Sequence, residues 1–152
     1  MRDLSRALIA LTLCAPLALA GQPALAADMV MPRGAATGLT ETDVGKPYWM
    51  LLSQCAGMFS AAYTLHTKRE DAEAAEADKM VGTAMLNAAV DRLVRDRGLD
   101  RKSALAMASE GLAAGRVSGN EILSRGTGRR SPWNTQRSAC LDIHDGYLGK
   151  YG

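Results

Sequence analysis

Sulfur and imidazole side chains occur in two closely spaced pairs along the chain. Cys55 and Met58 are three residues apart, and Cys140 and His144 are four apart. Both spacings place two side chains on one face of a helix, so each pair could offer two ligands to one metal ion. Thiolate, thioether and imidazole together suit copper(I) and, less well, zinc. The competing hypothesis is a disulfide, because two bonded cysteines cannot act as thiolate ligands.

A methionine and a histidine from two helices can also serve as axial haem ligands. If the helices are antiparallel and the cysteines are bridged, His144 lies about 6 Å along the axis from the bridge, next to the level of Met50. The chain has no Cys-x-x-Cys-His motif, and methionines in an alanine-rich helical chain usually pack in the core. We therefore expect no cofactor. A copper or haem carrier that uses His144 with Met50, Met58 or the two cysteines is the alternative function.

No arrangement of residues points to catalysis. Asp142 and Asp145 are two residues and one residue away from His144, so neither shares its face of a helix. The chain contains no Gly-x-Ser-x-Gly, His-Glu-x-x-His or P-loop motif. The sequence therefore favours a protein that is not an enzyme, and it predicts no catalytic residue.

Basic residues gather between positions 116 and 137. This segment has one acid, Glu121, and five arginines: Arg116, Arg125, Arg129, Arg130 and Arg137. Guanidinium groups bind phosphate and carboxylate well, and a helix that begins in the segment would add free N–H groups. The predicted anion- or partner-binding residues are Arg125, Arg129, Arg130 and Arg137. An anionic component of the cell envelope or an acidic protein would fit them; the alternative is a solvated loop without a ligand.

Four helices would position these side chains. Apolar residues recur at helical spacing over residues 47–67, 70–97, 100–114 and 131–147. The acids that open the second helix are expected on a solvated face. Small residues on the third helix permit another helix to approach closely. The glycine-rich residues 116–130 are predicted to form a long loop with one short helical turn.

The expected fold is an all-α, four-helix bundle-like domain with a helix-to-helix disulfide. Aromatic residues make up 5% of the chain and hydrophobic residues 47%, which suits a core of Ala, Leu, Val and Met between helices. Cys55 on the first helix and Cys140 on the last are the predicted disulfide partners. The chain-entropy model gives roughly 4 to 5 kcal/mol for closing a loop of this size, about 86 residues.

The first 26 residues have the plan of a secretory signal peptide. A start containing Arg2 and Arg6 is followed by an apolar run and by small residues before a cleavage point after Ala26, with Ala20 as the second candidate. The apolar run, about 14 residues, is shorter than the roughly 20 residues that span a bilayer. A signal peptide predicts export, in which case the two remaining cysteines meet an oxidising compartment.

The predicted domains are a signal peptide (1–26), a flexible leader (27–43) and a single helical domain (44–152). The formal net charge is +2 for the whole chain and about +1 without the signal peptide, which holds two arginines and one aspartate. A net charge this close to zero does not favour nucleic-acid binding, which normally uses a concentrated basic surface. We therefore expect a periplasmic or secreted binding or scaffolding protein, with no transmembrane segment in the mature chain.

Overall fold

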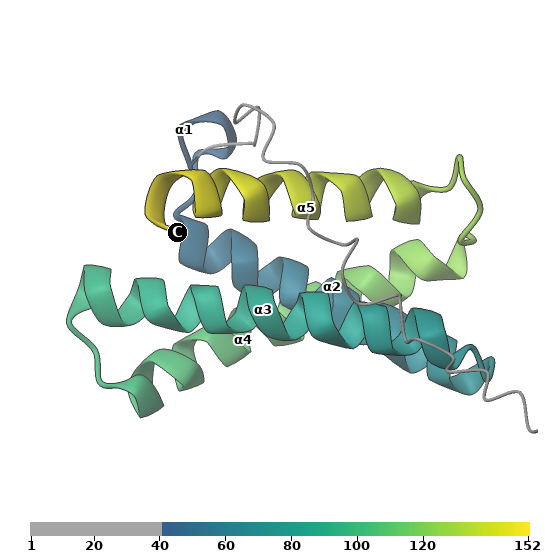
Figure 1. The fold of residues 1–152 in the computed structure, drawn as a ribbon, viewed down its shortest axis with the longest axis horizontal. Coiled ribbons are helices and arrows are strands. Elements are labelled where there is room, and N and C mark those ends of the chain that lie inside the picture. Colours follow the sequence, from purple (N-terminus) through teal and green to yellow (C-terminus); the bar gives the residue numbers. More distant parts are fainter. Residues whose placement is uncertain (1–40) are drawn as a thin grey trace, which may run out of the picture. The chain divides into compact units, whose positions relative to one another are not determined.

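The computed structural model describes residues 41–152, which form a short helical turn and four long helices and contain no strand (Figure 1). The predicted signal peptide and the predicted leader up to residue 40 lie outside the described residues. The all-helical class is confirmed. The elements in chain order are α1 (Glu41–Val44), α2 (Tyr48–Lys68), α3 (Ala72–Arg97), α4 (Arg101–Ser124) and α5 (Pro132–Tyr151).

The ends of the long helices follow local capping chemistry. The side chains of Asp71, Asp100 and Ser131 accept hydrogen bonds from backbone N–H groups in the first turns of α3, α4 and α5. Gly98 ends α3 in the left-handed conformation, at φ 63°. Pro47 has no capping side chain, and Glu41 of α1 accepts a hydrogen bond from the first N–H of α2 instead, at 2.8 Å.

The predicted end of the third helix at residue 114 is wrong, because α4 continues to Ser124. The long loop predicted from residue 116 therefore begins only at Arg125. Gly119 falls in the predicted loop but does not end the helix, because Gly111, Gly115 and Gly119 occupy one face of α4 at intervals of four residues. They lie against α2, so their missing side chains allow helix packing instead of ending the helix. The predicted close approach of another helix to the small residues of this helix is confirmed at Gly111 and Gly115.

Backbone atoms of α2 and α4 meet along this face. A Cβ atom added to Gly115 would overlap the carbonyl oxygen of Gln54, and one added to Gly57 would overlap the carbonyl oxygen of Leu112. Gly119 lies against Met58 in the same way. Residue numbers rise together on both sides of this contact, so α2 and α4 run parallel.

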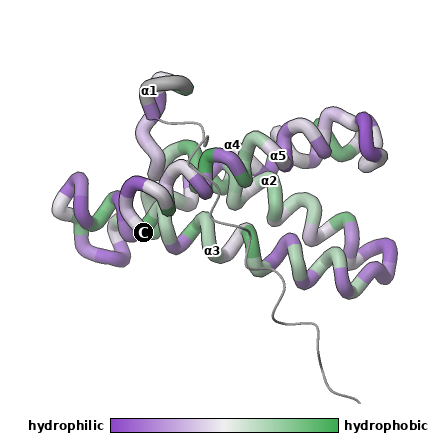
Figure 2. The backbone as a smooth tube through the Cα atoms, turned by 45° about the horizontal axis from the view of Figure 1, so that its top comes forward, coloured by the Kyte–Doolittle hydropathy of each residue, from purple (hydrophilic) through white to green (hydrophobic). Residues whose placement is uncertain are grey.

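The central element of the fold is α2, which packs against α3, α4 and α5. Leu52, Phe59 and Ala62 are completely buried in the core between the helices. Gly82 of α3 lies against Phe59, and α3 runs antiparallel to α2. In Figure 2 the hydrophobic colour recurs along the helices, whereas the hydrophilic colour gathers at the turns.

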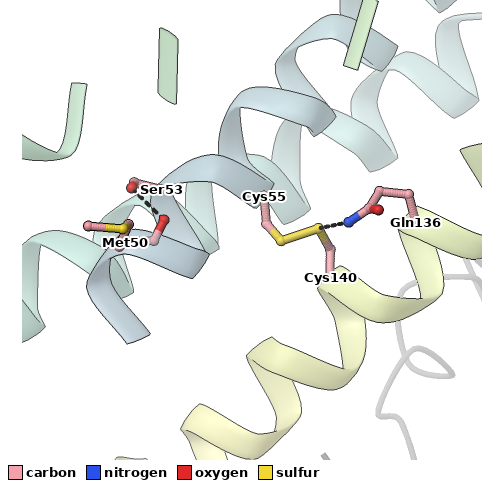
Figure 3. Close-up of a disulfide and its surroundings, with 5 residues drawn as sticks. All are labelled: Met50, Ser53, Cys55, Gln136 and Cys140. Atoms are coloured by element: carbon pink, nitrogen blue, oxygen red, sulfur yellow. Dashed lines mark hydrogen bonds between the residues drawn. A yellow bond between two sulfur atoms is a disulfide. The ribbon is translucent and has the colours of Figure 1, made fainter. Parts of the chain in front are cut away.

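The predicted pairing of Cys55 and Cys140 is confirmed, with an S–S distance of 2.08 Å between α2 and α5 (Figure 3). Edge-to-face aromatic pairs lie on both sides of the disulfide. Phe59 packs on Trp133 with ring centroids 5.7 Å apart, and Tyr48 packs on Tyr147 at 5.9 Å. This order makes α5 antiparallel to α2. None of the helices in residues 41–152 is long and apolar enough to cross a membrane.

Replacing Gly115 with alanine tests the backbone contact. The added Cβ meets backbone atoms, which cannot rotate away as a flexible side chain can, so Gly115→Ala should lower the free energy of unfolding by about 2 kcal/mol. Urea denaturation measures this change. The control is Gly128→Ala, because a Cβ at Gly128 meets nothing within 4 Å. The control should stay within about 1 kcal/mol of the parent protein. Equal stability of the two variants would contradict the contact.

Candidate functional site

The parallel course of α2 and α4 brings their C-terminal ends together at one end of the domain. A groove of about 330 Å³ lies there. The loop before α5 returns to the same end (Figure 1). The Arg69 guanidinium donates a hydrogen bond to the Thr127 hydroxyl at 3.3 Å, which joins the end of α2 to this loop. We call the basic residues of this region the basic end: Lys68, Arg69, Arg125, Arg129 and Arg130.

The structure places three of the four predicted anion-binding arginines in the basic end. Arg125 forms an exposed ion pair with Glu121 at 2.7 Å. Arg129 and Arg130 are exposed, and their guanidinium groups have no hydrogen bond or ion pair within residues 41–152. The carbonyl oxygen of Arg129 accepts a hydrogen bond from the Asn134 side chain, which fixes the loop backbone beside α5. Two cations of the loop are therefore available to a partner.

Arg137 does not join the other three predicted arginines. It lies on α5, half-buried, with its guanidinium 5.8 Å from the centre of the Phe59 ring. Its positive charge acts on the carboxyl of Asp78 in α3. The structure therefore gives Arg137 a place between helices and not on the loop.

Lys68 and Arg69 are basic-end residues that the sequence analysis missed. They are adjacent in sequence at the end of α2, and both line the groove. A basic pair at the end of a helix normally complements the negative end of the helix dipole, so on its own it gives no functional signal. Only the return of the 125–131 loop to the same place makes the pair part of a larger basic surface.

Asp78 is the one acid from the opening of α3 that does not lie on a solvated face. Its residue exposure is 5%, and one carboxylate oxygen lies 3.7 Å from Nε2 of His66. Burial raises the pKa of Asp78, while the charges of His66 and Arg137 oppose the rise and Asp71 adds to it. The expectation that all these acids face solvent is wrong for Asp78. Its signal was the spacing of Ala75, Asp78, Gly82 and Met85, which places it on the buried face.

His66 lies between two carboxylates in this cluster. Its Nδ1 atom is 3.6 Å from Asp71, which is too long for a hydrogen bond, and it is buried without a hydrogen-bond partner among the described residues. His66 belongs to α2, Asp78 to α3 and Arg137 to α5. Asp78 therefore interacts electrostatically with side chains of two other helices, but burial outweighs their effect and keeps its pKa raised.

The residues considered for a metal or haem site lie on α2 and α5 and do not converge on one point. The sulfur atoms of Cys55 and Cys140 are bonded to each other, so they are not thiolate ligands. The side chain of Met50 points away from Cys140 in Figure 3, and the backbone of Met58 faces Gly119 of α4. His144 is half-buried on α5, and burial lowers its pKa. Within residues 41–152, no three His, Cys, Asp or Glu side chains are grouped to hold a metal ion.

No family model matches the chain, and no curated protein or solved structure is significantly similar to it. The side chains of the domain are therefore the guide to its function. The strongest functional feature is the basic end, which combines five cations, a groove and two guanidinium groups without a partner in the part of the chain that the structure describes. Glu121, the one acid in residues 116–137, is already paired with Arg125.

Asp78 gives the cluster a testable pH dependence. Because the pKa of Asp78 in the folded protein lies above its ordinary value of 3.8, the folded state binds its proton more tightly than the unfolded state. The contribution of Asp78 to the free energy of unfolding is present at low pH. It is lost as the pH rises from 3.8 through the pKa of Asp78 in the folded protein. The free energy of unfolding of the parent protein, measured relative to Asp78→Asn, should therefore decrease over this interval.

Urea denaturation at a series of pH values measures this difference. Glu73→Gln is the matched control, since Glu73 is an exposed acid on the same helix. A difference between parent and Asp78→Asn that stays constant or increases with pH would contradict the assignment of Asp78 as a buried acid with a raised pKa.

Proposed function

We propose that this protein is exported and acts as a binding or scaffolding protein that holds an anionic partner at its basic end. The observation that carries the proposal is the pair of exposed guanidinium groups of Arg129 and Arg130, which have no partner within residues 41–152. They stand on a loop that a hydrogen bond joins to Arg69. Guanidinium groups present N–H donors in a planar fork that matches carboxylate and phosphate.

Export is supported by two features of the chain. Residues 1–26 follow the pattern of a secretory signal peptide. Cys55 and Cys140 form a helix-to-helix disulfide, and disulfides of this structural kind are typical of oxidising compartments. A periplasmic or secreted location is part of the proposal.

The strength of exposed ion pairs limits what the partner can be. A single exposed pair contributes about 0 to 1 kcal/mol, so one arginine would hold a simple anion only weakly. Several cations acting on several negative charges give a useful affinity. The proposed partner therefore carries repeated negative charge, as an anionic component of the cell envelope or an acidic protein surface does.

A variant with three loop arginines replaced by serine, Arg125→Ser, Arg129→Ser and Arg130→Ser, tests this function. The variant should elute from phosphocellulose at a clearly lower salt concentration than the parent protein, because the local positive charge falls by three. The melting temperature should change little, since these side chains are exposed and lie outside the core.

The matched control removes the same number of charges elsewhere. Lys46→Ser, Arg95→Ser and Lys102→Ser replace exposed cations that lie outside the basic end. The control should elute close to the parent protein. Elution of both triple variants at the same salt concentration would mean that net charge alone causes retention, and it would overturn the proposal.

A further inference from the structure

The groove at the basic end has an apolar floor and a polar rim. Ala61 and Leu65 of α2 and Leu123 of α4 line it together with more polar residues: Thr64, Lys68, Arg69, Asn120 and Ser124. Ala61 and Leu123 are almost completely buried, so their side chains contribute only a small apolar surface at the base. The volume, about 330 Å³, is at the low end for sites that bind small molecules.

Two of the polar side chains on the rim already have partners. The Thr64 hydroxyl donates to the carbonyl oxygen of Ser60 at 2.9 Å, and the Ser124 hydroxyl donates to the carbonyl oxygen of Glu121 at 2.7 Å. The remaining donors are Lys68, Asn120 and the N–H groups of Arg69 that do not bind Thr127. Two of these three side chains are cations.

The charge at the rim is positive even after the helix dipoles are counted. The C-terminal ends of α2 and α4 each contribute roughly half a negative charge. Lys68 and Arg69 contribute two positive charges, so a net positive charge of about one remains. An apolar floor below a positive rim complements a molecule that has one anionic group and one apolar part.

We propose that this groove binds a small amphiphile with a single anionic head on a short aliphatic stem. The stem lies on Ala61, Leu65 and Leu123, and the head receives hydrogen bonds from Lys68 and Arg69. This inference rests on the proposed function, since it assigns a ligand class to one part of the basic end. Carboxylate and phosphate heads share the required chemistry.

An NMR titration of the disulfide-bonded protein with octanoate tests the proposal. Octanoate should shift the amide resonances of groove residues on both α2 and α4. Hexanoate should bind about tenfold more weakly, because each buried methylene contributes about a factor of four. Octanol, which lacks the charge, and acetate, which lacks the stem, should each bind at least about tenfold more weakly than octanoate. A titration with octyl phosphate compares a phosphate head with the carboxylate head of octanoate.

Two groove variants locate the binding. Lys68→Gln removes one cation from the rim and should weaken octanoate binding about tenfold. Asn120→Trp places a large side chain at the rim and should abolish binding. Lys102→Gln, at the start of α4, removes an exposed charge far along the helix and should have no effect. A melting temperature for each variant establishes that it is folded.

The outcomes separate this inference from the proposed function. The variant Arg129→Ser and Arg130→Ser should keep its octanoate affinity and elute from phosphocellulose at a lower salt concentration than the parent protein. Octanoate binding with unchanged retention would overturn the function of the loop and support the groove. Three results would overturn the groove proposal: no amide shifts with octanoate at millimolar concentration, equal affinity for octanol and octanoate, or undiminished octanoate binding by Lys68→Gln. The loop function would still be decided by the phosphocellulose experiment.

Discussion

The close contact between the backbones of α2 and α4 determines how the rest of the domain is arranged. Gly57, Gly115 and Gly119 create it, because a Cβ at any of them would overlap backbone atoms of the facing helix, and Gly111 leaves room for the Ser53 side chain. Each glycine inside a helix costs about 1 kcal/mol relative to alanine, so the contact is not favoured by local helix propensity. Dispersion between closely packed atoms over a long interface opposes that cost. The result is a parallel pair whose C-terminal ends, and the groove between them, lie at the basic end.

A second set of interactions holds α5 and the loop before it. The Cys55–Cys140 disulfide joins the middle of α2 to α5, and aromatic pairs such as Phe59–Trp133 fill the interface beside it. Arg137 of α5 also lies beside α2, with its guanidinium 5.8 Å from the centre of the Phe59 ring. These contacts position the start of α5, and the hydrogen bond from Asn134 to Arg129 extends that positioning to the loop. The exposed guanidinium groups therefore stand on a loop with fixed ends.

The sequence predicted the features that depend on local chemistry. Asp100, Gly98 and the Ser131-Pro132 pair mark helix ends through hydrogen bonds and backbone preferences within a few residues, and the structure confirms them. The disulfide was predictable because two cysteines remain after the predicted signal peptide. The full length of α4 was not, since Gly119 in the glycine-rich stretch after residue 116 indicates a helix break until a partner helix is present. The Lys68–Arg69 pair was not predictable either, since it joins a larger basic surface only through the return of the 125–131 loop. The burial of Asp78 had a signal in its helical spacing from Ala75 and Gly82, which the charge of the neighbouring acids outweighed.

Short interproton distances across α2 and α4 test the central contact most directly. Isotope-edited NOE spectra of the oxidised protein should show cross-peaks between the Hα protons of Gly115 and protons of Gln54, and between Gly119 and Met58, because their backbones touch. Cross-peaks at both pairs would establish the parallel register that forms the basic end. Their absence, with Gly115 showing contacts only to residues of α4, would contradict the account.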